Sequence, residues 1–420
     1  MLFLLAIVFV LCYTIHQAVG IAVVCLTTAL AVLWRTWHGA GVRVNRKDAV
    51  YAAYAAAALA PTIRHGGMYE TAFYCGIVLY PWLVSFLFQN MTIDWPRVTG
   101  WSLLTTAIAC GTVAVLLFQV APGQFDISLE RLVTLDRNRG FVYRGDRTGP
   151  NKAASMALAG FAVILALLKF RRLPFMVGVP VLATLSVLLM IAGGRIASLS
   201  ASVLILIYGV TAFQGGLRQR GRQLAGAAAL MIVLAPGAVL TYRTLNATHG
   251  ERFQERVEGV TNPLEDRSLL VRLEDWSRAA EMIRGDPWGL GFNAYYASYG
   301  RTPHNELLGQ WIGGGWVGAA LYVCLIVYLV IRSWSVVMYR LTCTTEGFTH
   351  YVLLSLLSAA CLVMLTEHIT RGGLSTFYPI VWMAVGLSYA APKYPAAGRG
   401  GTIGVTGGPG RDLAFEVRMP

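Results

Sequence analysis

The dominant pattern along this chain is a series of long apolar runs separated by shorter polar segments. Runs of about 20 residues are long enough to cross ~30 Å of hydrocarbon as helices. The first run has no basic segment before it and no small-residue cleavage site after it, so we interpret it as a retained helix. We predict an all-α polytopic membrane protein with about twelve transmembrane helices, at approximately 2–15, 18–34, 49–62, 71–89, 99–120, 152–169, 174–192, 196–213, 224–241, 306–331, 349–366 and 374–391.

Basic loops alternate along the predicted topology. They follow every second apolar run and read "RTWHGAGVRVNRK", "DWPR", "KFRR", "LRQRGR" and "RSWSVVMYR". Lys and Arg in short loops mark the cytoplasmic side, so we expect these loops and both termini there. That side carries 17 Lys/Arg against 5 Asp/Glu, a net of +12, and the opposite side carries 17 against 16, a net of +1. The overall charge of +13 therefore reflects membrane orientation and not a nucleic-acid-binding surface.

Two long loops lie on the predicted extracytoplasmic side. The first is at about 121–151 and the second at about 242–305. In the second, the apolar spacing from Ser268 to Arg284 predicts a helix with Leu269, Leu270, Leu273, Trp276, Ala280 and Ile283 on one face. We expect four parts: helices one to nine at 1–241, a large catalytic loop at 242–305, helices ten to twelve at 306–391, and a flexible, Gly- and Pro-rich cytoplasmic tail at 392–420.

The segment "RTPHNELLGQW" begins at Arg301, where the second long loop gives way to an apolar run. Pro303 disfavours helical geometry in the residue before it, and Asn305 is a typical N-cap, so we expect a helix to begin here. A neutral imidazole at such a helix start can accept a proton from a hydroxyl group. His304 is therefore a candidate base. The alternative is an interfacial histidine satisfied by a backbone group.

Arg195 is the one basic residue between two apolar runs joined by almost no loop, in "LLMIAGGRIASLSASVLILI". An arginine at the centre of a membrane costs about 2.5 kcal/mol or more and is usually paired or functional. Its planar guanidinium suits bidentate binding of a diphosphate. The alternative is an arginine whose side chain extends to the membrane surface.

Other candidates share the predicted extracytoplasmic side. Arg272 either binds an anion or is a solvated partner of Glu274, Asp275 or Trp276 on its own helix. Tyrosine rings stack on sugars, although tyrosines also gather at membrane surfaces. Possible substrate-binding residues are Asn305, Tyr295, Tyr296, Arg301 and Arg371.

Four motifs follow one another in the second half of the chain. They are "GGRIASLS" at 193–200, "VRLEDWSRA" at 271–279, "GDPWGLGFNAYY" at 285–296 and "PHNELLGQWIGGGWVG" at 303–318. Their order and spacing resemble the O-antigen ligase and O-antigen polymerase superfamily. Its members are bacterial multi-span enzymes with a large periplasmic loop before a His-Asn motif at a helix start. The resemblance covers roughly 190–330 by motif and the remainder by hydropathy and helix number.

The resemblance implies a metal-independent, inverting glycosyltransferase reaction at the periplasmic face of the bacterial inner membrane, without a cofactor. A glycan moves from undecaprenyl diphosphate to an acceptor hydroxyl. By position, His304 matches the histidine that activates the acceptor, and Arg195 and Arg272 match arginines that hold the diphosphate. The implied partners are the undecaprenyl-diphosphate-linked glycan donor, a glycan or lipid-linked glycan acceptor, the lipid bilayer and other polysaccharide assembly proteins.

Three activities stay open at this point. The loop of about 64 residues at 242–305 is modest for a lipopolysaccharide-core ligase, which favours a repeat-unit polymerase of O-antigen, capsule or exopolysaccharide. An O-antigen ligase acting on lipid A-core is the alternative. A transporter or flippase of lipid-linked sugars would need ionisable residues deep in several helices, and the midspan regions here are nearly free of charge.

Overall fold

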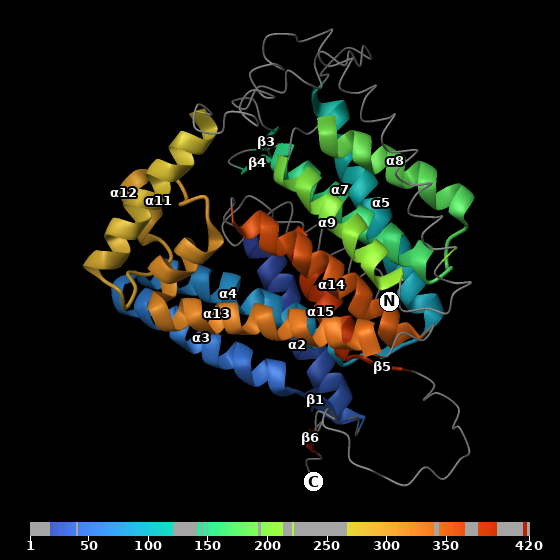
Figure 1. Ribbon diagram of the computed structural model, residues 1–420. Coiled ribbons are helices and arrows are strands. Elements are labelled where there is room, and N and C mark those ends of the chain that lie inside the picture. Colours follow the sequence, from blue (N-terminus) through green and yellow to red (C-terminus); the bar gives the residue numbers. More distant parts are fainter. Residues whose placement is uncertain are drawn as a thin grey trace.

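The structure is a computed structural model and is almost entirely helical (Figure 1). It describes residues 17–38, 41–120, 141–143, 146–148, 150–191, 195–212, 221, 267–339, 344–365, 377–392 and 415–417. Its helices are α2 (Gln17–Trp37), α3 (Arg46–His65), α4 (Met68–Gln89), α5 (Trp95–Val120), α7 (Pro150–Lys169), α8 (Phe175–Ile191), α9 (Arg195–Ala212), α11 (Arg267–Gly285), α12 (Ala294–Tyr299), α13 (Glu306–Tyr339), α14 (Thr345–Met364) and α15 (Phe377–Tyr389).

Each predicted membrane span that falls mainly within the described residues coincides with one of these helices. The predicted spans at 2–15 and 224–241 lie outside the described residues. Within the described part, three helices are long and apolar enough to cross a membrane, namely α4, Glu306–Met338 of α13, and α14. Five more are apolar but shorter: Ile21–Trp37, Ala154–Lys169, Phe175–Ser186, Leu199–Thr211 and Phe377–Tyr389. The polytopic helical fold class is thus supported, while the number of twelve spans stays a prediction.

The core lies around α7, α14 and α15, whose apolar side chains are mostly buried. From Ala154 to Leu167 the apolar side chains of α7 are at most 2% exposed. Helix α2 instead exposes a row of leucines, with Leu26, Leu30 and Leu33 all more than half exposed. A helix that is apolar all round is suited either to a protein core or to lipid. The packing shows that α7 is a core helix and that α2 has an apolar face exposed to its surroundings.

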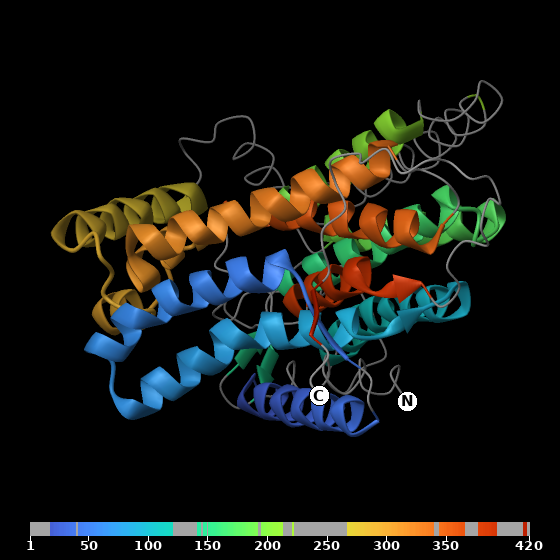
Figure 2. The same ribbon diagram turned by 90° about the horizontal axis from the view of Figure 1, so that it is seen from below.

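One group of contacts joins helix ends around the start of α13. Asn293 donates a hydrogen bond to Glu70 at the start of α4 (2.5 Å), and Asn305 donates one to the backbone oxygen of Leu365, directly after α14 (3.2 Å). We call this region the His304 end of the molecule. Helices α11 and α12 lie beside this start of α13, at one side of the helical body (Figures 1 and 2).

A second group of contacts forms the opposite end. The rings of Trp95, Phe170 and Phe348 pack together there, and Lys169 at the end of α7 donates to Thr211 near the end of α9. All these residues lie in or beside loops predicted as cytoplasmic, and the His304 end collects loops predicted as extracytoplasmic. The arrangement agrees with the predicted alternation.

The described strands are short, and the pairs β1–β6 and β2–β5 join segments that are distant in the sequence. Strand β2 (Thr92–Ile93) pairs parallel with β5 (Ala391–Pro392), and β3 (Phe141–Tyr143) pairs antiparallel with β4 (Asp146–Thr148). Strand β1 (Val42–Val44) pairs antiparallel with β6 (Phe415–Val417). The last pairing gives an ordered contact to a tail predicted to be flexible; the rest of that tail after Pro392 lies outside the described residues.

Candidate functional site

The start of α13 confirms the predicted N-cap. The helix begins at Glu306, and the side-chain oxygen of Asn305 accepts a hydrogen bond from the backbone N–H of Leu308 (3.1 Å). The side-chain amide of Asn305 also donates to Leu365. One residue therefore satisfies an otherwise unpaired donor at the helix start and fixes that start to the end of α14.

His304 precedes this cap and has an unusual backbone conformation. Its φ of 48° lies in the left-handed region, where histidine is more frequent than most residues but still uncommon. Such a conformation costs about 1–3 kcal/mol and persists only where the surroundings impose it. Part of that constraint is visible, because the indole N–H of Trp276 on α11 donates to the backbone oxygen of His304 (3.4 Å). The side chain of His304 is partly buried.

Ten residues into α13 the helix is interrupted at Gly315, whose φ of 67° and ψ of −177° are not helical. The turn between α11 and α12 fills this break. The N–H of Leu290 donates to the oxygen of Ile312 (2.8 Å), and the N–H of Trp316 donates to the oxygen of Pro287 (3.0 Å). Backbone groups that the break removes from the helix are thereby paired again, as burial near a membrane requires.

Close backbone contact at this junction requires glycine on both sides. Gly289 has a φ of 103°, and a Cβ there would lie 2.5 Å from the nitrogen of Gly315. A Cβ at Gly315 would collide with the backbone oxygen of Trp288, and one at Gly313 would collide with the ring of Phe292. Gly289 of "GDPWGLGF" and Gly315 of "WIGGGW" therefore form the two sides of one packed junction.

The break at Gly315 divides α13 into two helical segments, and Tyr54 on α3 contacts both of them. Its hydroxyl donates to Gln310 in the first segment (2.8 Å), and its ring lies 5.4 Å from the ring of Tyr322 in the second. The first segment, which begins beside His304, is thereby held to α3.

Helix α11 confirms the prediction for 268–284, but the predicted apolar face is partly wrong. Leu270 is 48% and Leu273 is 40% exposed, whereas Asp275 and Ala279 are fully buried. The physical reason is that the buried carboxylate of Asp275 has polar partners on other elements, which a pattern of apolar residues does not reveal.

Those partners are Tyr295 and Arg301. The hydroxyl of Tyr295 donates to Oδ1 of Asp275 (2.9 Å), and Nε of Arg301 lies 2.7 Å from the same oxygen. Burial, and then the hydrogen bond to Asp275, raise the pKa of Tyr295 above its ordinary value. Tyr295 therefore stays a neutral hydrogen-bond donor, and both of these candidate substrate-binding residues have a defined contact within the protein.

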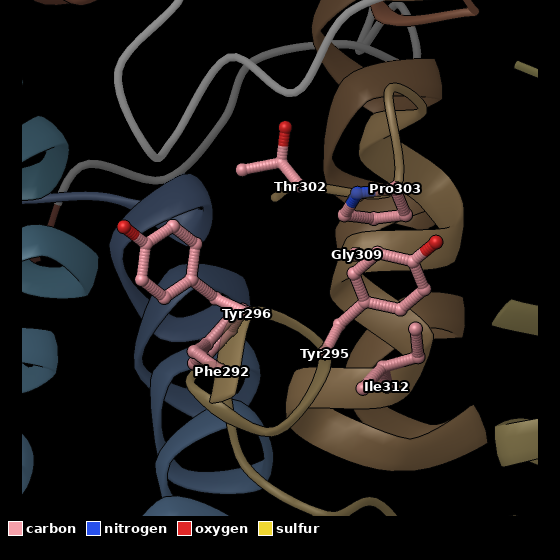
Figure 3. A pocket seen from close by; sticks show the side chains of 7 residues that line it. All are labelled: Phe292, Tyr295, Tyr296, Thr302, Pro303, Gly309 and Ile312. Carbon is pink, nitrogen blue, oxygen red and sulfur yellow. The ribbon is translucent and has the colours of Figure 1, made fainter. Parts of the chain in front are cut away.

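A small pocket of about 10 Å³, room for about one water molecule, lies directly beside residues 301–304, which we call the His304 loop. It is lined by Phe292, Tyr295, Tyr296, Thr302, Pro303, Gly309 and Ile312. Figure 3 shows that the rings of Tyr295 and Tyr296 point in different directions, the first toward α13 and the second away from it. Tyr296 is 46% exposed and is the tyrosine of this pair that is accessible to a ligand.

Of the two arginines predicted to bind the diphosphate, the structure describes the side chain of Arg272 but not that of Arg195. Arg272 is partly buried and lies one turn before Trp276 on α11, so both side chains project from the same side of that helix. Arg195 is the first residue of α9, and its side chain lies outside the described part. Helix α9 packs on α14 and has its last turn at the opposite end, so its first turn lies toward the His304 end. Arg371 lies outside the described residues.

Sequence reasoning missed a buried polar chain beneath His304. The side-chain amide of Gln310 donates to Glu306 (2.7 Å) and its oxygen accepts from Tyr54. Asp275 and the indole of Trp276 were also not singled out as contacts of this loop. The available signal was the polar spacing of Glu306 and Gln310, which lie four residues apart in an apolar helix.

Comparison with known proteins gives one family. Residues 180–323 match the family model described as O-antigen ligase. The matched segment runs from α8 to the middle of α13 and includes Arg195, Arg272 and His304. A search of curated proteins finds no match for the chain. The match agrees with the resemblance carried by the four motifs: residues 180–323 are similar to the O-antigen ligase family, which supports a membrane glycan-processing function of ligase or polymerase type.

Proposed function

We propose that this protein is a glycosyltransferase that moves a glycan from undecaprenyl diphosphate to an acceptor sugar hydroxyl, as a repeat-unit polymerase of O-antigen, capsule or exopolysaccharide. The observation that carries the proposal is the placement of His304. It lies at the capped start of α13, in a constrained backbone conformation, against the helix that bears Arg272. The membrane is the bacterial inner membrane, with the site on its periplasmic face.

In the proposed reaction, His304 accepts the proton of the acceptor hydroxyl as its oxygen bonds to the anomeric carbon. The bond from that carbon to the diphosphate oxygen breaks, and the lipid diphosphate leaves with the electron pair. Arg195 and Arg272 bind the developing negative charge, which is the kind of stabilisation that fixed cations provide best. One direct displacement inverts the anomeric centre. Base and cations come from the chain itself, so the scheme uses neither metal nor cofactor.

The acceptor side of the site has fewer candidates. Tyr296 is exposed at the pocket beside the His304 loop, where its ring is available to a sugar face. Arg371, which precedes α15 in the sequence and lies outside the described residues, is a further candidate contact. Asn305, Tyr295 and Arg301 make the protein contacts described above, so we assign them to holding the site in shape.

The second candidate function is an O-antigen ligase, favoured by the description of the matching family. Its acceptor is lipid A-core, whereas the acceptor of a polymerase is another lipid-linked repeat. The loop of about 64 residues before α13 favours the polymerase. Glycan analysis of a deletion strain separates them: a polymerase deletion leaves single repeats on lipid A-core, and a ligase deletion leaves unattached polymer on its lipid carrier.

The first test is transfer by the purified protein with a lipid-linked donor. We expect His304→Ala to lower kcat by about 10²-fold or more, because general-base catalysis typically contributes 10²–10⁴-fold. The matched control is His65→Ala, an exposed histidine at the end of α3. Near wild-type transfer by folded His304→Ala would show that His304 is not the base.

A further inference from the structure

The loop that carries His304 is held to α11 at two points. At its start, Arg301 forms an ion pair with Asp275 (2.7 Å). At its end, the backbone oxygen of His304 accepts from Trp276, the next residue on the same helix. Two adjacent residues of α11 therefore fix both ends of a four-residue segment that would otherwise be an exposed loop.

The charge of Asp275 is fully buried, and two different elements depend on it. Its side chain is 0% exposed and binds both Arg301 from the loop and the hydroxyl of Tyr295 from α12. The backbone oxygen of Asp275 also accepts from Tyr295 (3.2 Å). A buried carboxylate is costly unless it is paired and hydrogen-bonded. The folded state therefore favours the positions of Arg301 and Tyr295 in which both contact Asp275.

Arg272 projects from the same side of α11, one turn before Asp275 and Trp276. The distance between the proposed base and the proposed diphosphate arginine is therefore set by how α11 meets the His304 loop. Misplacing reacting groups by about 1 Å is enough to lower a rate by about 10²-fold.

We propose that Asp275 is a positioning residue for the transfer reaction: its buried carboxylate, paired with Arg301, fixes the His304 loop to the helix that bears Arg272. This inference rests on the proposed function. Asp275 does not touch the reacting atoms. It sets the backbone conformation in which His304 meets the acceptor while Arg272 holds the donor.

The adjacent residue of α11 provides a matched control. Glu274 pairs with Arg278 four residues on (2.5 Å), but Glu274 is 53% and Arg278 is 35% exposed. An exposed pair of this kind contributes little, because water and ions screen it. Glu274 also lies 3.8 Å from Arg301. Arg278→Gln thus removes an exposed arginine–carboxylate pair from the same helix and leaves both carboxylate contacts of Arg301 in place.

The experiment compares wild type, Asp275→Asn, Arg301→Gln, the double variant and Arg278→Gln. We expect kcat per folded protein to fall about tenfold to 10²-fold in the two single variants at Asp275 and Arg301. The double variant should be less impaired than Arg301→Gln, because it leaves no unpaired carboxylate buried. Arg278→Gln should stay within about twofold of wild type.

Hydrogen exchange of the amides at 300–305 gives a readout that does not require activity. We expect faster exchange there in Asp275→Asn and unchanged exchange in Arg278→Gln. If Asp275→Asn does not fold, Tyr295→Phe removes only the hydroxyl bound to Asp275 and should also speed exchange at 300–305.

The outcomes separate the two proposals. Wild-type kcat and exchange in folded Asp275→Asn, or in Tyr295→Phe where the first variant does not fold, would overturn the positioning role. Absence of transfer by the wild-type protein would instead contradict the proposed function, and the exchange comparison would still decide whether Asp275 fixes the loop.

Discussion

At the scale of single residues, two kinds of contact hold the region around His304. Asn305 caps α13 through its immediate neighbours in the chain, and a cap of this kind is predictable from residue type. Asp275 and Tyr54 have partners far away in the sequence. The residue type does not show whether a carboxylate is buried or exposed, because its partners come together only in the folded protein.

Removing one hydroxyl tests the buried chain beneath His304. In Tyr54→Phe the ring still packs against Tyr322, but Gln310 loses the donor at its side-chain oxygen. We expect a loss of about 1–2 kcal/mol in the free energy of unfolding, because a buried acceptor is left without a partner. The measurement is thermal unfolding of the detergent-solubilised protein.

The control is Tyr296→Phe, which removes a hydroxyl from an exposed residue. Its unfolding free energy should change by less than about 0.5 kcal/mol, as for most surface substitutions. Equal stability of both variants would show that the chain from Tyr54 to Glu306 contributes nothing measurable.

At the scale of elements, the decisive feature is the break in α13. The sequence predicts one continuous run from 306 to 331, and apolar content alone gives no reason to divide it. The glycines at 313, 314 and 315 permit a break, but glycine also occurs in intact membrane helices. The break exists because the turn before α12 supplies hydrogen bonds to Ile312 and Trp316.

Gly315→Ala tests this junction. A Cβ at this position meets the backbone oxygen of Trp288, and alanine strongly disfavours a φ of 67°. We expect a loss of at least about 2 kcal/mol in the free energy of unfolding, from left-handed strain of about 1–2 kcal/mol together with overpacking. Transfer activity per folded protein should also fall, because this junction positions the first segment of α13, which begins beside His304.

Gly209→Ala on α9 is the matched control, because a Cβ there has nothing within 4 Å. Its stability should equal or slightly exceed that of wild type, since alanine favours a helix over glycine by about 1 kcal/mol. If Gly315→Ala behaved in the same way, the turn would not be packed into the break in solution.

At the scale of the whole molecule, the helices divide into a central group and an outer group. Helices α7, α14 and α15 are buried in protein, and α2 exposes its leucines. Hydropathy does not distinguish these groups, because lipid and protein interior favour the same side chains. The grouping of loops into two ends follows the charge pattern, which links orientation in the membrane to the position of the site.

The predicted orientation is tested with single cysteines in a variant without the seven native ones. Ser298→Cys lies at the His304 end and Arg97→Cys at the opposite end, and both positions are exposed. A membrane-impermeant maleimide applied to cells with a permeabilised outer membrane should label Ser298→Cys directly. It should label Arg97→Cys only after the inner membrane is broken. The reverse pattern would invert the topology and place His304 in the cytoplasm.

The sequence by itself determined the helical membrane class, the alternation of the loops, the cap at Asn305 and the order of the four motifs. These features depend on composition, on charge or on neighbours within a few residues, so they are visible in one dimension. Only the tertiary structure decided which apolar helices are central, where α13 breaks and how Asp275 and Trp276 hold the His304 loop. Each of these depends on contacts between segments distant in the chain. Such contacts contribute stabilising free energy only after the segments have come together in the folded protein.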